Sequence, residues 1–389
     1  MKFSYIFIVL LILLFSQCFS YIGWNPTLGG QFTKVILLVL LVYCLINIKK
    51  IPTTKMNPFV LLLMILPFVS ILSSYSIHGQ NVGIGFQVTM FSLTYLFYFI
   101  LYLLKIDSRV ILKICLLFGI FWVVMEVVQQ ITYPTIWFAT RYDTLESTVE
   151  IRNGIYRYNM EGREFGLILL FFCFQKYVET QKRKFIIGIV FGLVGIYLLA
   201  TRQIMVTSAF CLIYGLFAMH KIKITSFLVI LLMVAIVYLN FDTLFGGYVE
   251  MSQDIDSDNI RVFSYNFYGL EYNHGQFLPF LIGNGIEGDS SYGKEIAKFQ
   301  EFGLWRADIG IVGMYSLYGI IYVLTVIAFF IYIFIKRKSV DVYLKMYVLY
   351  MFVTSIMLHH FGYSTHHIMT LCIILYLIDT SILNKVCNE

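Results

Sequence analysis

The sequence predicts an all-α polytopic membrane protein that crosses the bilayer about twelve times. Apolar residues make up 59% of the 389 positions and charged residues only 13%, far less charge than a soluble globular chain carries. Apolar segments that approach or reach the length a helix needs to cross about 30 Å of hydrocarbon recur along the whole chain. Lys and Arg gather in alternate connections between them. We therefore expect one transmembrane domain over residues 1–389 and no ordinary soluble enzyme.

The expected spans follow the apolar segments in order. The first begins like a signal sequence, but Gln17-Cys18-Phe19-Ser20 is a poor cleavage site, so we expect this segment to remain as a span. The sixth carries Arg163 and Glu164 at its start and is the most polar. The spans are expected near residues 4–22, 32–48, 57–75, 84–104, 110–131, 163–178, 185–200, 203–219, 224–240, 308–335, 343–359 and 364–383.

The basic residues predict the sidedness of these spans. Cytoplasmic connections of membrane proteins are rich in Lys and Arg. With the twelve expected spans, most of the 28 basic residues fall on one side: Lys2, Lys49, Lys50, Lys55, Lys105, Arg109, Lys113, Lys176, Lys182, Arg183, Lys184, Lys221, Lys223, Lys336, Arg337, Lys338, Lys345 and Lys385. That side is predicted to be cytoplasmic, with both termini inside.

Two long connections are expected on the outer side, at residues 132–162 and 241–307. The second is rich in acidic residues and also in Tyr and Phe. Connections longer than about 15 residues are usually functional or disordered. Its aromatic content favours an ordered extracytoplasmic loop, with short helices on the membrane surface and rings that can stack on sugars.

Arginines kept on the outer side need a reason beyond topology, and they are the first candidates for a site. Arg202 is the sharpest case, because it lies between two apolar segments with almost no connection around it. The alternative to a functional role is that the Arg202 side chain simply extends to the lipid headgroups. Arg forms rigid bidentate hydrogen bonds to phosphate, so several of them would suit a lipid-linked diphosphate. The candidates are Arg157, Arg163, Arg202, Arg261 and Arg306.

Histidines and acids near the outer side supply candidate proton acceptors. Four histidines lie between His359 and His367, where they could contact glycan or phosphate or act as a base. Their spacing matches no standard zinc site, and no outer Cys accompanies them, so we expect no metal. The candidate bases are Glu161, Glu164, Asp308 and His360, with His359 and His366 as binding residues.

Several classes of function lack a sequence basis. There is no phosphate-binding G-x-x-x-x-G-K-[ST] loop, no H-E-x-x-H and no G-x-S-x-G. The seven cysteines are scattered without a C-x-x-C pair and read as small buried hydrophobes. We expect no cofactor and no nucleic-acid partner.

The chain resembles the O-antigen and capsule polysaccharide polymerase/ligase superfamily of bacterial inner-membrane proteins. The similarity covers residues 150–315 and rests on short elements. They are Gly154-Ile155-Tyr156-Arg157, Thr201-Arg202, Asn259-Ile260-Arg261, Gly283-Asn284-Gly285 and the segment from Trp305 through Arg306 and Asp308 to Gly313. Ligase members usually carry a His-Asn pair before the last element, whereas residues 299–304 here read Phe-Gln-Glu-Phe-Gly-Leu. This difference favours a polymerase.

The resemblance implies a glycosyltransferase of O-antigen, capsule or related lipopolysaccharide and polysaccharide biosynthesis. It would polymerise repeat units carried on undecaprenyl diphosphate at the outer face of the cell inner membrane. Arg202, Arg261 and Arg306 would hold the leaving diphosphate, with Arg157 and Arg163 on the second carrier. A chain-length regulator and a flippase are the expected partners besides the lipid bilayer.

Three alternatives remain open. The first is an O-antigen ligase that transfers polymer to lipid core. The second is a lipid-linked oligosaccharide flippase, which should line a central cavity with charges, whereas the spans here are nearly free of charge. The third is a secondary transporter, for which the repeat symmetry is missing.

Overall fold

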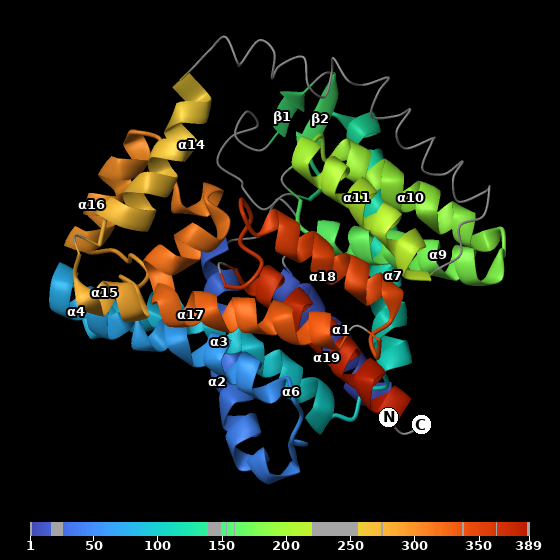
Figure 1. Cartoon of the computed structure of the whole chain (residues 1–389), viewed down its shortest axis with the longest axis horizontal. Coiled ribbons are helices and arrows are strands. Elements are labelled where there is room, and N and C mark those ends of the chain that lie inside the picture. Colours follow the sequence, from blue (N-terminus) through green and yellow to red (C-terminus); the bar gives the residue numbers. More distant parts are fainter. Residues whose placement is uncertain are drawn as a thin grey trace.

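A computed structural model describes residues 2–16, 26–138, 149–219 and 256–386, apart from residues 153, 159, 274, 337 and 363. This part of the chain is mainly helical, which confirms the class expected from the sequence (Figure 1). The α-helices before the hairpin are α1 (Lys2–Ser16), α2 (Pro26–Ile46), α3 (Asn57–Val69), α4 (Ile71–His78), α5 (Val82–Thr89), α6 (Leu96–Leu103) and α7 (Ser108–Thr132). Those after it are α9 (Arg163–Thr180), α10 (Lys184–Leu198), α11 (Arg202–Met219), α14 (Asp256–Asn266), α15 (Phe277–Ile282), α16 (Ser291–Glu301), α17 (Gly310–Ile335), α18 (Val342–Thr354) and α19 (Thr365–Val386).

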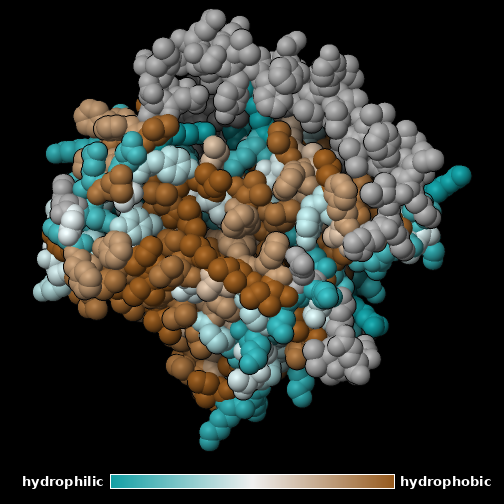
Figure 2. Space-filling view, in the orientation of Figure 1, coloured by the Kyte–Doolittle hydropathy of each residue, from teal (hydrophilic) through white to brown (hydrophobic). Residues whose placement is uncertain are grey.

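Six helical segments of the described chain are long and apolar enough to cross a membrane. They are Asn57–His78, Val82–Leu103, Ser108–Thr132, Arg202–Met219, Gly310–Ile335 and Thr365–Leu383. Shorter apolar helices cover Phe3–Ser16, Gly30–Ile46, Lys184–Leu198 and Val342–Thr354. The expected span at residues 224–240 lies outside the described residues. Hydrophobic residues cover much of the face in Figure 2, and α17 alone exposes Leu324, Ile331 and Phe334.

Glycines bring the middle helices into close contact. A Cβ atom added at Gly119 of α7 would lie 2.5 Å from the backbone oxygen of Phe165 in α9. One added at Gly192 of α10 would lie 2.7 Å from the Cβ of Leu170 in α9. Small residues allow helix backbones to approach in this way where lipid provides no hydrophobic force between helices. The α7, α9 and α10 helices therefore pack as one unit.

A hairpin of two short strands departs from the all-α expectation. The strands β1 (Val149–Arg152) and β2 (Ile155–Tyr158) pair antiparallel, with Val149 opposite Tyr158. The hairpin is fixed to the end of α7, because Tyr158 Oη donates to the Gln129 carbonyl at 2.6 Å and the Tyr156 amide donates to Gln130 Oε1 at 3.1 Å. This hairpin occupies part of the connection expected at residues 132–162.

The described part of the second long connection is helical and is anchored on α17. A π-helical turn, Phe267–Glu271, lies between α14 and α15, and a 3₁₀ turn, Arg306–Asp308, lies between α16 and α17. Asn284 and Gly285 donate their backbone N–H groups to the carbonyls of Ser316 and Leu317 at 2.9 Å each. These bonds meet α17 just before Gly319, where the helix has a φ of 78°. Residues 241–255 of the expected loop lie outside the described residues.

The connections gather at two ends of the helices. We call one the hairpin end, which holds the β1–β2 hairpin, residues 256–309 and residues 355–364. Next to these segments, the first turns of α9 and α19 meet through Arg163 and His367. Residues 355–364 contact the turn before α17 through His359 and the Arg306 carbonyl.

We call the other the basic end, which holds residues 47–56, 104–107, 181–183 and 336–341. There Tyr98 donates to Asp379 at 2.9 Å, and Ser381 donates to the Ser339 carbonyl at 3.2 Å. Exposed basic residues lie in these connections or in the first turns of the helices that follow them: Lys49, Lys50, Lys55, Lys105, Arg109, Lys113, Lys182, Arg183, Lys184, Lys336 and Lys338.

Candidate functional site

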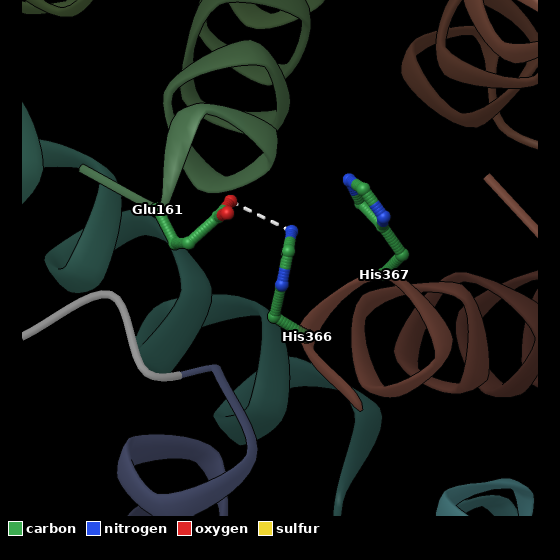
Figure 3. Close-up of side chains that lie close together, drawn as sticks. All are labelled: Glu161, His366 and His367. Atoms are coloured by element: carbon green, nitrogen blue, oxygen red, sulfur yellow. Dashed lines mark ion pairs between the residues drawn. The ribbon is translucent and has the colours of Figure 1, made fainter. Parts of the chain in front are cut away.

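The candidate site lies where the first residues of α9 and α19 meet at the hairpin end. Gly162, with a φ of 122°, turns the chain into α9 directly after Glu161. The turn carries Glu161 toward the start of α19, where His366 and His367 lie (Figure 3). Two segments about 200 residues apart in the sequence therefore supply one cluster. Because the residues are so far apart in the chain, no local sequence motif could have shown that they meet.

Glu161 and His366 form the more accessible half of the cluster. His366 Nε2 lies 2.6 Å from Glu161 Oε2, and the two side chains are 9% and 26% exposed. The opposite ring nitrogen of His366, Nδ1, lies 3.1 Å from the Ser364 hydroxyl. His366 is thus held between a carboxylate and a hydroxyl, which is the environment of an imidazole that can accept and pass on a proton.

Arg163, Glu164 and His367 form the deeper half. Arg163 Nε donates to Glu164 Oε1 at 2.8 Å, and Glu164 is only 3% exposed. Arg163 Nη2 lies 3.1 Å from His367 Nε2, and His367 Nδ1 lies 3.0 Å from the Ser364 hydroxyl. Since guanidinium only donates, His367 Nε2 must be an acceptor, and its Nδ1 then carries the proton.

These contacts define one direction of donation through the cluster. His367 Nδ1 donates to the Ser364 oxygen, which leaves the Ser364 hydroxyl to donate to His366 Nδ1. His366 then carries its proton on Nε2, which faces the Glu161 carboxylate. The hydrogen bonds run from Arg163 through His367 and Ser364 to His366, whose Nε2 lies 2.6 Å from Glu161, the most exposed side chain of the cluster.

His359 and His360 flank the cluster and are buried. His360 Nε2 lies 2.6 Å from the Thr354 hydroxyl, and burial, helped by the charge of Arg163, lowers the pKa of His360 to about 3. Burial also lowers the pKa of His359 to about 4. Both rings are therefore neutral at pH 7, so His360 is a weak proton acceptor and His359 a hydrogen-bonding group.

His359 ties the cluster to Arg306, because its Nε2 lies 2.8 Å from the Arg306 carbonyl. The Arg306 side chain, however, is buried and turned into the helical region before α17. Its Nη1 donates to Glu287 at 3.0 Å and its Nη2 to the Tyr292 hydroxyl at 3.1 Å. Its guanidinium also lies about 5 to 6 Å from the ring centres of Tyr268, Tyr272 and Tyr292.

Arg306 therefore holds this region together rather than offering its charge to a ligand. Burial alone would lower the pKa of Arg306, but the neighbouring Tyr292 and Glu287 raise it well above the usual value. The guanidinium stays charged, and a charged group at 3% exposure needs such partners. In this arrangement the Arg306 guanidinium has no open face with which to clamp a diphosphate, as the sequence analysis had expected it to do.

The remaining candidates lie outside the cluster. Arg202 is the first residue of α11 and is half-buried. Arg157 lies on β2, close enough to Glu126 of α7 for their charges to interact. Arg261 of α14 and Asp308 at the start of α17 are exposed.

The structure thus joins Glu161, Arg163 and His366 directly and places His359 and His360 beside them. Glu164 was a candidate base in the sequence, and the geometry makes it the partner of Arg163. Ser364 and His367 were not among the chosen residues. The tract of four histidines carried the signal for His367, but the position of Ser364 between His360 and His366 gave no hint of its central role.

The electrostatics of the cluster suit an anionic ligand beside a proton acceptor. The N-termini of α9 and α19 meet there, and each carries about half a positive charge from the helix dipole. Arg163 adds a positive charge that its pairing with Glu164 partly offsets, and Glu161 is the more exposed of the two carboxylates. Comparison with protein-family models, with curated proteins and with solved structures gave no match.

Proposed function

We propose that this chain is a glycosyltransferase that polymerises repeat units carried on undecaprenyl diphosphate. The observation that carries the proposal is the joining of Glu161 and His366 to Arg163 at the meeting point of two helix N-termini. A base and an anion-binding group side by side are what transfer from a diphosphate carrier to a sugar hydroxyl requires. The sequence resemblance to polysaccharide polymerases supports the same class.

In this reaction Glu161 accepts the proton of the attacking hydroxyl on the acceptor sugar. The hydroxyl oxygen bonds to the anomeric carbon of the donor glycan as the bond from that carbon to the diphosphate oxygen breaks. His366 Nε2 lies 2.6 Å from Glu161 Oε2 and holds the carboxylate by charge attraction once the ring is protonated. The negative charge leaves with the diphosphate, so neither a nucleotide donor nor ATP is needed.

Positive charge then stabilises the departing diphosphate. Arg163 and the first turn of α9 supply it at the cluster, and Arg202 opens α11 at the same end of the helices. Arg157 and Arg261 are assigned to the carriers and their glycans. Arg306 is left out of the clamp, because it is buried and its Nη1 and Nη2 are bound to Glu287 and Tyr292.

The sidedness of the proposal follows from the basic end. Positive residues face the cytoplasm in inner-membrane proteins, so the basic end would be cytoplasmic and the hairpin end would face outward. Both termini are then cytoplasmic, and the cluster lies where lipid-linked repeat units arrive after flipping. This arrangement places acceptor and donor carriers in the outer leaflet.

The proposal is tested by gel analysis of surface glycan in a deletion strain of the host bacterium. The strain is complemented with wild type, Arg163→Ala, Arg202→Ala or Arg261→Ala, with Lys182→Ala at the basic end as the control and protein levels checked by blot. We expect wild type and the control to restore a ladder and Arg163→Ala and Arg202→Ala to leave single repeat units. Long polymer that accumulates on the carrier indicates a ligase, and absence of repeat units from the outer face indicates a flippase.

A further inference from the structure

Three side chains of the cluster present metal-ligating atoms to one point. One carboxylate oxygen of Glu161 and one nitrogen each of His366 and His367 all lie within 4.8 Å of one another. Figure 3 shows the Glu161 carboxylate directed at the His366 ring, with His367 beside it. The two imidazole rings are 3.9 Å apart at their centres and tilted by 49°. The sequence could not reveal this set, because its carboxylate comes from a distant segment.

The orientation of both imidazoles is set by one hydroxyl. Ser364 Oγ lies 3.1 Å from Nδ1 of His366 and 3.0 Å from Nδ1 of His367. A serine oxygen has two lone pairs and can accept from both Nδ1–H groups. The Nε2 of His366 then faces Glu161 at 2.6 Å, and the Nε2 of His367 faces Arg163 at 3.1 Å. A hydrogen bond from the second ring nitrogen is the usual support of a metal-bound histidine.

The local charge also permits a dication. Glu164 pairs with Arg163 at 2.8 Å and partly offsets the arginine charge, and the Glu161 carboxylate remains to face an ion. Glu161 is 26% exposed and His367 is 14% exposed, which opens the set to solvent.

We propose that Glu161, His366 and His367 bind one divalent transition-metal ion, with Zn²⁺ preferred. Two imidazoles and one carboxylate are a typical ligand set of open zinc sites, whereas Mg²⁺ and Ca²⁺ prefer oxygen ligands. Ligand atoms of tetrahedral zinc lie roughly 3.3 Å apart, which small side-chain rotations achieve here. On binding, the His366 proton moves from Nε2 to Nδ1, and Arg163 releases His367 Nε2 while keeping Glu164.

This inference does not rest on the proposed function. Metal binding uses the Nε2 lone pair of His366, whereas its support of Glu161 in proton transfer uses the Nε2 proton. The metal-bound and metal-free clusters are therefore alternative states of one site. Failure to bind metal would leave the glycosyltransferase proposal intact, and loss of polymer in a variant would not by itself support a metal.

The test measures bound zinc in the full chain. Protein purified in detergent through a tag without histidine is stripped with a chelator and dialysed against micromolar ZnCl₂. Metal content is measured by mass spectrometry, and CoCl₂ is used as an absorption probe of four-coordinate geometry. We expect one Zn²⁺ per chain in wild type, the visible bands of tetrahedral Co²⁺, and no binding of Mg²⁺ at the same concentration.

Matched variants decide whether this cluster holds the ion. Glu161→Gln and His366→Gln should lose the ion, and Ser364→Ala should weaken its affinity about 10- to 100-fold. His78→Gln, outside the cluster, should keep it. Thermal unfolding without metal checks that each variant folds, and Glu161→Gln preserves the shape of the side chain if His366→Gln does not fold. Absence of zinc from wild type, or equal zinc in wild type and both ligand variants, overturns the proposal.

Discussion

His359 and His360 are adjacent in the sequence but serve different parts of the molecule. His359 reaches the Arg306 carbonyl and so contacts the helical region before α17, whereas His360 packs against Thr354 at the end of α18. Both rings are at most 5% exposed. Burial disfavours the charged form of each imidazole, which makes protonation of this pair a way to weaken the hairpin end.

The pair predicts a loss of stability in mild acid. Their pKa values of about 4 and about 3 in the folded chain lie below the ordinary 6.5, so the unfolded chain takes up protons first as pH falls below 6.5. Stability is therefore full above pH 6.5 and declines toward the folded pKa values. When the pH falls from 7.5 to 5, the titration of each histidine should lower the free energy of unfolding by about 2 kcal/mol.

Thermal unfolding in detergent at the two pH values measures this effect. His360→Gln should show a smaller difference between pH 7.5 and pH 5 than wild type, because one of the two proton sites is absent. An equal difference in wild type and in the variant would show that the histidine is not the titrating group.

Residue types in the sequence indicated part of the site, and the fold supplied the rest. The sequence indicated Glu161, Arg163 and the histidine tract as candidate reactive residues, but it did not show which of them lie together. Arg306 looked equally available in the sequence, since nothing there predicts that Glu287 and Tyr292 fold onto it. Charge alone does not show whether an arginine faces a ligand or the protein interior.

At the scale of elements, the packing of α9 between α7 and α10 positions Arg163 and Glu164 at the cluster. The contact depends on glycines on both neighbours, Gly119 on α7 and Gly192 on α10. Apolar periodicity predicts that such helices exist, but it does not predict which faces meet. The β1–β2 hairpin escaped the sequence analysis for a related reason, because its strands are four residues each and depend on Gln129 and Gln130 of α7.

A methyl group at the α7–α9 contact should destabilise the helix unit. In Gly119→Ala the added carbon would lie 2.5 Å from the Phe165 backbone oxygen, which cannot move without shifting α9. We expect a loss of about 1–3 kcal/mol, as for other overpacked interiors. Gly30→Ala in α2 is the control, because no atom lies within 4 Å of its added carbon.

Unfolding in detergent, followed by helix content, compares the two variants. Gly119→Ala should unfold at lower temperature or denaturant than wild type, and Gly30→Ala should match or slightly exceed it. Equal stability of the two variants would show that α7 and α9 do not touch at this glycine.

At the scale of the whole molecule, the grouping of connections at two ends agrees with the alternation of basic residues along the sequence. Exposed basic residues lie in or beside the connections of the basic end. The apolar segments of the sequence predicted apolar helices, and six helical segments of the described chain are long and apolar enough to cross a membrane. The expected count of about twelve spans also depends on residues 224–240, which lie outside the described chain.

Sidedness is tested by labelling single cysteines in intact cells with a membrane-impermeant maleimide. The described native cysteines are buried, so new ones are placed at exposed positions, Glu301→Cys at the hairpin end and Lys182→Cys at the basic end. Cys-free protein with either substitution should be labelled outside only at position 301, and position 182 should react only after permeabilisation. The reverse pattern would place the cluster in the cytoplasm.

The most direct test of the central claim is the length of glycan on the lipid carrier in cells that carry Glu161→Gln. The substitution keeps the shape of the side chain and removes the carboxylate that would accept the proton. Mass spectrometry of extracted carriers should show single repeat units in Glu161→Gln and long chains in wild type, at equal protein levels. Long chains at the wild-type level in the variant would contradict the assignment of Glu161 and His366 as the reacting pair.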